Sequence, residues 1–454
     1  MRLTTLRLTA PLALWGILSA ETVESQQINT MVPAVEPSFW QAAGSVVAIN
    51  GATWAYNWYV QRWNWSNVGT RAWLNNLRDG FVWDDDAFLD NQLAHPYHGS
   101  LYHNAARGSG YGFWASTPFV VAGSLGWELL SENIQPSLND LINTTLGGIA
   151  LGEVTFRLSS LLASSPRSGV GTGLAREAGA FLLSPMGRTQ ALLNGKRRDA
   201  AISSQARMQT STTWISVGRR REVIGVGDGA AEPQSFVRLR FDYGSPFARG
   251  ALRPYDAFDF SLELSPQETG VITHAAVSGL LARKTLHRSA RSEMLLGLFQ
   301  NFDYEQVPGF KASSQSVSGA LLFRRQTGRG AHLVLGAHLE AVPLGAVLSD
   351  HNRYRHRDYD YGPGLAGRFT GSLQSHGRDL LRVDTRVLWV HSVYGADADH
   401  FATTTQVSAM VPVMRTFGVG ADVGLMFRRS VYQNKPRLLD RIPRLRAYLV
   451  WSPS

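Results

Sequence analysis

The sequence predicts an α+β protein in which an N-terminal helical domain is followed by an antiparallel transmembrane β-barrel of about twelve strands. Two observations support this fold class. The apolar residues recur with a helical period up to about residue 205, and with a period of two after it. Many of the alternating segments run for about ten residues or more, and transmembrane strands need roughly 9–11 residues.

The N-terminus has the pattern of a secretory signal peptide over residues 1–20. Arg2 and Arg7 are basic, the stretch 8–18 is apolar, and the small residues Ser19 and Ala20 follow it. The apolar run is too short to span a membrane, so the alternative is a first core helix. The 454-residue chain has no Cys. This excludes a disulfide framework and thiol chemistry.

Residues 35–205 form the predicted helical domain. Nine of the 13 Trp lie between Trp40 and Trp127. A Trp cluster is typical either of a membrane interface, where its amphipathic ring suits the headgroup level, or of an aromatic core. Pro136 and Ser137 predict a helix start, with the Ser137 hydroxyl as N-cap and Asp140 three residues on. The main helix candidates are 40–63, 92–107, 111–132 and 138–162.

Residues 210–453 form the predicted barrel. One face of each segment is apolar and the other charged, as in Val237, Leu239 and Phe241 alternating with Arg238 and Arg240. An even strand number is what a closed bacterial outer-membrane barrel requires. The twelve candidate strands begin near Thr212, Ser235, Ala257, Gly270, Ser292, Ser314, Ala331, Gly362, Leu380, His400, Phe417 and Arg444.

The connections between these segments give an independent indication. Outer-membrane barrels have short periplasmic turns and longer external loops. From the sixth segment onward the even-numbered connections are short, whereas 349–361 and 434–442 are long; the connection 245–256 breaks this rule. The charged inward positions are expected to line the lumen. They are Arg238, Arg240, Asp242, Asp259, Glu263, Arg382, Asp384 and Arg386.

An ordered set of motifs lies in the helical domain. The stretch 95–102 reads HPYHGSLY, Trp127-Glu128 is followed by Glu132, Pro136-Ser137 precedes Asp140, and Gly152-Glu153 comes last. In these motifs the sequence resembles the uncharacterised bacterial domain-of-unknown-function family 3943, over about residues 83–157. The resemblance implies a bacterial envelope protein and carries no established activity.

The candidate catalytic residues come from these motifs: His95, His98, Glu128, Glu132, Asp140 and Glu153. Glu128 and Glu132 are four residues apart and share a helix face. Three interpretations remain open. The group is a buried polar network paired with Arg107 and Arg157, a metal site built from His95, His98, Glu128 and Glu132, or a catalytic site with histidine as general base. Ser100 and Ser137 lack the G-x-S-x-G context of a nucleophile, and no H-E-x-x-H motif is present.

The sequence therefore predicts an outer-membrane barrel with a helical plug or periplasmic base, in transport or envelope organisation. The alternative is a membrane-embedded hydrolase or transferase acting on envelope lipid or glycan. The helical domain is expected on the periplasmic side or in the barrel mouth. No cofactor is predicted. Expected partners are outer-membrane lipid, including lipopolysaccharide, and the barrel assembly machinery. In the connection 349–361, Arg353, Arg355 and Arg357 suit lipopolysaccharide phosphates, and the favoured alternative is a surface loop whose charges pair with one another. Nucleic acid is not expected, because no recognition motif accompanies the dispersed basic residues.

Overall fold

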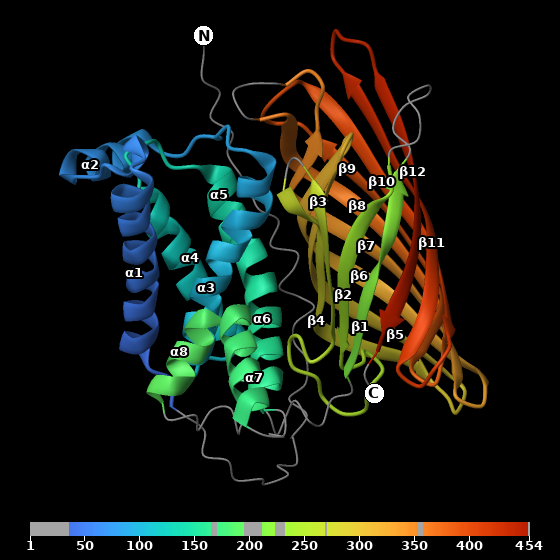
Figure 1. Cartoon of the computed structure of the whole chain (residues 1–454). Helices are drawn as coiled ribbons and strands as arrows, with labels where there is room; N and C mark the ends of the chain where they lie inside the picture. Colours follow the sequence, from blue (N-terminus) through green and yellow to red (C-terminus); the bar gives the residue numbers. More distant parts are fainter. Residues whose placement is uncertain are drawn as a thin grey trace. The chain divides into compact units, whose positions relative to one another are not determined.

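The computed structural model describes residues 36–164, 170–194, 211–222, 232–267, 270–352 and 357–452. The predicted signal peptide lies outside these residues, and so do Arg353 and Arg355 of the predicted lipopolysaccharide-binding loop. Helices come first and strands second, which confirms the predicted α+β order (Figure 1). The α-helices are α1 (Phe39–Ala55), α2 (Thr70–Asp79), α3 (His95–Gly108), α4 (Phe113–Leu130), α5 (Leu138–Ile142), α6 (Gly148–Ser164), α7 (Val170–Leu183) and α8 (Pro185–Leu193).

Three π-helical turns extend or join these helices. They are Tyr56–Gln61 after α1, Asp90–Ala94 before α3, and Asn143–Gly147 between α5 and α6. Isolated π-turns inside helices are uncommon, and many of those that do occur lie at functional sites. The turn Asp90–Ala94 directly precedes His95, and the turn Asn143–Gly147 begins three residues after Asp140.

The close crossing of α3 and α6 organises the helical part. A Cβ added at Gly99 would lie 1.8 Å from the carbonyl oxygen of Thr144, and one added at Gly148 would lie 2.5 Å from the backbone of Gly99. Only glycine fits at this distance, so these two positions determine how closely the helices approach. Pro96 lies in the first turn of α3, directly after the π-helical turn Asp90–Ala94.

The strands close into one antiparallel barrel in which each strand pairs with its neighbours in sequence and β1 pairs with β12. This confirms the predicted twelve strands. They are β1 (Ser211–Glu222), β2 (Gln234–Tyr243), β3 (Phe258–Gln267), β4 (Gly270–Arg288), β5 (Ser292–Val307), β6 (Phe310–Gly328), β7 (Ala331–Leu348), β8 (Tyr359–Ser375), β9 (Arg378–His391), β10 (Ala398–Pro412), β11 (Phe417–Tyr432) and β12 (Leu438–Trp451).

The last strand begins six residues earlier than predicted. Pro443 lies within β12 opposite Leu425, and the strand continues on its N-terminal side to Leu438. A proline has no N–H to donate to a strand ladder, so in a sequence it indicates the end of a strand. Here the pairing with β11 continues on both sides of it.

The turn lengths follow the predicted pattern at one end of the barrel. β6 and β7, and β8 and β9, are joined by tight turns, whereas β7 and β8 are separated by residues 349–358. The long connection between β2 and β3 remains the exception. It contacts the helical part, since Arg157 Nη1 lies 3.0 Å from Asp256 Oδ1 and Arg157 Nη2 donates to the Pro254 carbonyl.

Ion pairs between strands that are not neighbours identify the inward face. Arg238 on β2 contacts Asp422 on β11, and Arg446 on β12 contacts Glu263 on β3. Arg240 on β2 pairs with Asp379 on β9. These side chains must meet across the lumen, so the predicted inward positions Arg238, Arg240 and Glu263 are confirmed.

The helical part packs against outward-facing side chains of the barrel. On β5, Glu305 points inward to Arg444 on β12, so by alternation Gln300, Phe302 and Tyr304 point outward. The Gln300 amide donates to the Leu146 carbonyl, and Phe302 and Tyr304 share one apolar core with helical residues. These contacts lie on the outer wall, whereas the sequence led us to expect a plug in the lumen or a base beneath it.

Among the described helices, one stretch, Leu138–Ala163, is long and apolar enough to cross a membrane by length and composition, and 67% of its most apolar window is buried.

Candidate functional site

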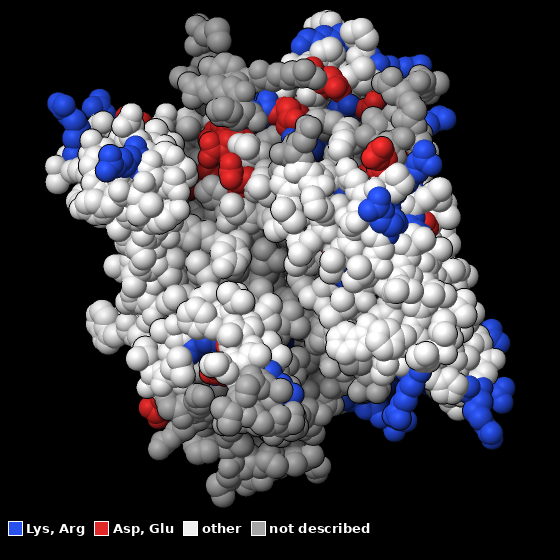
Figure 2. Space-filling model, in the orientation of Figure 1, with Lys and Arg blue, Asp and Glu red and all other residues white. Residues whose placement is uncertain are grey.

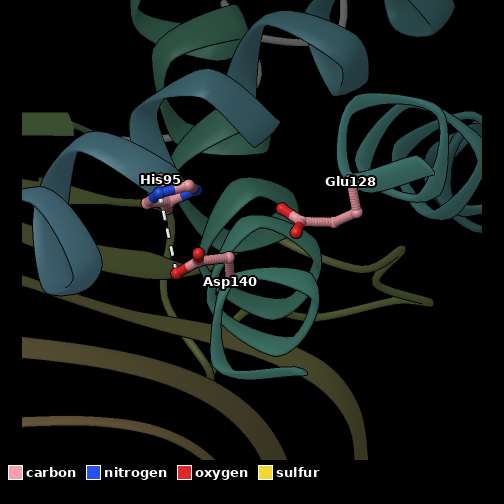
Figure 3. Close-up of side chains that lie close together, drawn as sticks. All are labelled: His95, Glu128 and Asp140. Atoms are coloured by element: carbon pink, nitrogen blue, oxygen red, sulfur yellow. Dashed lines mark ion pairs between the residues drawn. The ribbon is translucent and has the colours of Figure 1, made fainter. Parts of the chain in front are cut away.

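The structure brings together three of the six predicted site residues. His95 at the start of α3, Glu128 near the end of α4 and Asp140 on α5 place one nitrogen and two carboxylate oxygens within 4.8 Å of one another. His95 Nε2 lies 3.6 Å from Asp140 Oδ1. Figure 3 shows the Glu128 carboxylate pointing from its own helix toward the other two side chains.

Local hydrogen bonds orient each of these three side chains. His95 Nδ1 contacts the Thr144 hydroxyl at 3.1 Å, which turns Nε2 toward Asp140. Glu128 Oε2 accepts the Ser137 backbone N–H at 2.7 Å. The Ser137 hydroxyl caps α5 by accepting the Asp140 N–H, as the sequence predicted. Ser137 thus serves as a structural cap that positions two site carboxylates.

Asp84 joins the cluster, and the sequence reasoning did not single it out. Its Oδ1 accepts hydrogen bonds from the Asn91 amide at 2.7 Å and the Asn139 amide at 2.9 Å. Burial disfavours its charged form, yet hydrogen bonds with Asp140, Asn91 and Asn139, together with nearby His95, hold the pKa of Asp84 below its ordinary value. The three consecutive aspartates at 84–86 were the signal that could have indicated it.

Aromatic hydroxyls from the barrel complete the surroundings. Tyr361 on β8 donates to the Asp84 carbonyl and lies 3.2 Å from Asn139 Oδ1. Tyr359 bonds to the Asn91 amide and donates to the Asp86 carbonyl. The start of β8 therefore holds the aspartate segment in place from the barrel side.

The cluster has more carboxyl groups than cationic side chains. Asp84, Glu128 and Asp140 are three carboxylates, and Glu128 and Asp140 are almost fully buried. Like charges this close to one another repel strongly unless a proton or a cation offsets them. Arg357, on the barrel side, pairs with Asp85. One imidazole and several carboxylates form a donor set that suits zinc, manganese or iron(II).

His98 and Glu132 lie beside the cluster without joining it. His98 Nε2 is 3.1 Å from the Tyr102 hydroxyl, and its ring packs edge-to-face on Trp127. Glu132 accepts the Trp127 Nε1–H at 2.7 Å. Burial is the main cause that raises the pKa of Glu132 to about 8. Both side chains are engaged by Trp127 and its neighbours, which suits a supporting role.

Glu153 belongs to a separate buried network. Its carboxylate contacts His103 Nε2 at 3.1 Å, Arg107 Nε at 2.7 Å and Arg157 Nε at 2.8 Å. This is the polar network joining helices that the sequence allowed as one interpretation. It connects α3 and α6, and through Arg157 it reaches Asp256 on the barrel side.

The comparison with known families confirms the resemblance stated from the sequence. The family model for a domain of unknown function, DUF3943, matches residues 80–186. This range contains all six predicted site residues and Asp84. The match extends past the predicted boundary at residue 157 into α7 and α8.

Among the solved structures with similarity to part of the chain are two porins and an outer membrane channel. The NanC porin is 9% identical with a TM-score of 0.27, covering 52% of this chain and 100% of that chain. The KdgM porin is 10% identical with a TM-score of 0.25, covering 53% and 99%. The outer membrane channel DcaP of Acinetobacter baumannii is 8% identical with a TM-score of 0.23, covering 54% and 97%. No curated protein matches the chain.

Proposed function

We propose that this protein is an outer-membrane β-barrel that anchors a metal-dependent hydrolase or transferase domain acting on an envelope lipid or glycan. The observation that carries the catalytic part is the convergence of His95, Glu128 and Asp140 within 4.8 Å at the family-matched helices. The location rests on the barrel, and insertion by the barrel assembly machinery is part of the same proposal.

The outer wall of the barrel supports a membrane position. Every described strand has at least ten residues, and a transmembrane strand needs roughly 9–11. Figure 2 shows a barrel wall almost free of charged side chains, with Lys and Arg gathered toward its two ends. An apolar band between polar ends is the pattern of outer-membrane barrels. Large exposed apolar side chains on this wall include Val237, Leu296, Leu339, Leu365, Phe369, Val387, Val423, Leu445 and Leu449.

The lumen supports an anchoring role in preference to transport. Arg220, Arg386, Arg444 and Arg446 are each less than a tenth exposed, although they lie on the charged inward face. Each forms an ion pair with an inward carboxylate. A wide water-filled channel would leave such side chains exposed. The inward face of this barrel is packed by its own charged groups.

The residues of the cluster divide into ligands and supports. His95, Glu128 and Asp140 would hold a divalent metal, with Asp84 as a further carboxylate beside them. A bound divalent ion supplies Lewis acidity and lowers the pKa of a water for attack on an ester or phosphoryl centre. Asp84 and Asp140 share a hydrogen bond, so this pair can take up and return a proton. Thr144 and Ser137 keep the donor atoms oriented.

Metal binding by the purified full-length protein tests the site. Wild type and the variants Asp140→Asn and Glu128→Gln are titrated with Mn²⁺ and, separately, Zn²⁺, and bound metal is measured after desalting. We expect about one ion per wild-type chain, and affinity lowered by at least about tenfold in both variants, since each removes a ligand charge. The exposed carboxylate Asp79 provides the matched control, Asp79→Asn. Equal metal binding by wild type and Asp140→Asn, with both folded, would overturn the site.

Activity and conductance test the rest of the proposal. Purified protein is incubated with lipopolysaccharide and with phospholipid vesicles, with and without EDTA, and the lipids are examined by mass spectrometry. Product formed by wild type and abolished by EDTA supports the catalytic part. Metal binding without product from any envelope lipid or glycan would leave a cation site and contradict catalysis. Steady single-channel conductance in planar bilayers would instead favour transport.

A further inference from the structure

We propose that the helical part is an intramembrane domain, with the exposed faces of α1 and α4 in contact with lipid acyl chains beside the barrel. This inference rests on the outer-membrane position proposed for the barrel. It replaces the periplasmic base or plug expected from the sequence. It also gives the candidate site a substrate class, namely a lipid whose headgroup lies at the membrane surface.

The first helix has the composition of a lipid-facing segment. Between Glu36 and Arg62 no residue is charged. α1 has 17 residues and the π-helical turn that follows has 6. Together they extend about 34 Å, which matches a hydrocarbon core of about 30 Å. A soluble surface helix would carry charged residues on its outer face.

The outer face of this helix is apolar and exposed, and aromatic residues mark both of its ends. Trp40 is 82% exposed near its start, Val47 is 71% exposed in its middle, and Tyr59 is 68% exposed past its end. Aromatic rings at two levels separated by aliphatic residues are typical of membrane-interface belts. Water would solvate this face poorly, whereas acyl chains solvate it well.

The fourth helix has the same character. Its 18 residues span about 27 Å, close to the apolar band of about 25 Å on outer-membrane barrels. Its one charged residue, Glu128, is buried against Ser137 and the candidate site. Trp114 is 60% exposed and Val121 is 39% exposed, and both lie nearer the start of the helix than Glu128. A buried carboxylate and an exposed apolar face are what a helix in lipid requires.

The position of the helices on the barrel makes these faces continuous with the barrel belt. Phe302 and Tyr304 on the outward face of β5 are covered by helical residues. Leu339 on β7 and Leu365 on β8 are outward and exposed. The helical part therefore occupies a sector of the wall that acyl chains would otherwise cover. A domain bound to that sector is itself surrounded by lipid.

This placement puts the candidate site at one membrane surface. His95 begins α3, Glu128 lies in the last turn of α4, and Asp140 lies on the short α5, so the site is at the ends of these helices. Tyr359 and Tyr361, which contact the same region, begin β8 directly after the long connection 349–358. Long connections face the outside in such barrels. The site then lies at the headgroup level of the outer leaflet.

Cysteine accessibility tests the placement, because the chain has no Cys of its own. Single variants Val47→Cys on α1 and Val121→Cys on α4 are placed in lipid nanodiscs, which leave both membrane surfaces open to solvent. Each is reacted with a membrane-impermeant sulfonated maleimide. Val423→Cys on the exposed wall of β11 is the lipid-facing control, and Arg71→Cys on the exposed surface of α2 is the aqueous control.

We expect Val47→Cys and Val121→Cys to react at least about tenfold more slowly than Arg71→Cys, and as slowly as Val423→Cys, because a thiol in an apolar environment is not ionised. Fast reaction at Val47 with a protected Val423 would overturn the intramembrane domain and leave the barrel position intact. Fast reaction at Val423 as well would overturn the outer-membrane proposal itself. The mass of the nanodisc particles gives the number of protein copies in each. Protection at Val47 only in particles with two copies would also overturn the intramembrane domain, because a second copy of the chain would then cover α1.

Discussion

Arg444 on β12 and Glu305 on β5 meet across the inside of the barrel, with 2.6 Å between Nη2 and Oε1. The same guanidinium reaches Glu222 on β1 through Nε, at 3.0 Å. A single side chain thus ties a neighbouring strand and a distant strand together. Such pairs hold opposite walls of the barrel at a fixed separation.

Replacing Glu305 by Gln is expected to destabilise the barrel by about 3–5 kcal/mol, because it leaves the buried Arg444 charge without one of its partners. The measurement is the temperature at which the folded gel band converts to the unfolded one. Asp399→Asn, on an exposed carboxylate at the end of β10, is the matched control and should behave as wild type. Equal conversion temperatures for Glu305→Gln and wild type would contradict the prediction.

Gly99→Ala is expected to destabilise the helical part, because the new methyl group would lie 1.8 Å from the Thr144 carbonyl oxygen and force α3 away from α6. Overpacking of this kind costs about 1–3 kcal/mol or more. Gly44→Ala in α1 is the control, since nothing lies within 4 Å of its added Cβ. That change should be neutral or stabilising by roughly 0.5–1 kcal/mol. Proteolysis rates of the helical part report both effects, and similar rates for the two variants would argue against the tight crossing.

Glu153→Gln separates the structural network from the candidate site. Removing this charge leaves Arg107 and His103 short of their carboxylate, and the expected loss of stability is about 3–5 kcal/mol. Metal content measured on the folded fraction should stay at the wild-type level. The exposed Glu36→Gln is the control for charge removal. Loss of metal without loss of stability would assign Glu153 to the site.

The raised pKa of Glu132, about 8, predicts a pH dependence of stability. The native state binds this proton more tightly than the unfolded chain does. The stabilisation of the native state by this bound proton is therefore fully present below about pH 4.5. It declines as the pH rises and is lost once the pH has passed about 8. Glu132→Gln should flatten the stability curve between these limits. Melting followed by Trp fluorescence from pH 5 to 9 measures the difference, and parallel curves for variant and wild type would contradict it.

Much of the barrel was predictable because alternation along a strand depends on local sequence alone. Most predicted strand starts lie within four residues of the observed ones. Alternation cannot distinguish a side chain that faces lipid from one that faces a helix, so the contact between the helical part and the outer wall was not predicted.

The candidate site was predictable in part for a similar reason. Helical spacing indicated which residues share a face, but convergence of His95, Glu128 and Asp140 depends on the crossing of separate helices. Glu153 carries the same chemistry, yet Arg107 on α3 and Arg157 one turn along α6 draw it into another network. Asp84 lies in a loop without periodicity, and its place is set by Tyr361, 277 residues later in the chain.

The long sequence separation between Asp84 and Tyr361 has a consequence for how the protein folds. The helices are synthesised first, yet part of their packing surface consists of side chains on strands that follow much later. Until β8 is in place, the aspartate segment lacks the tyrosine that fixes it, and the apolar faces of the helices lack a wall. The helical half therefore completes its packing only once these strands of the barrel are in place.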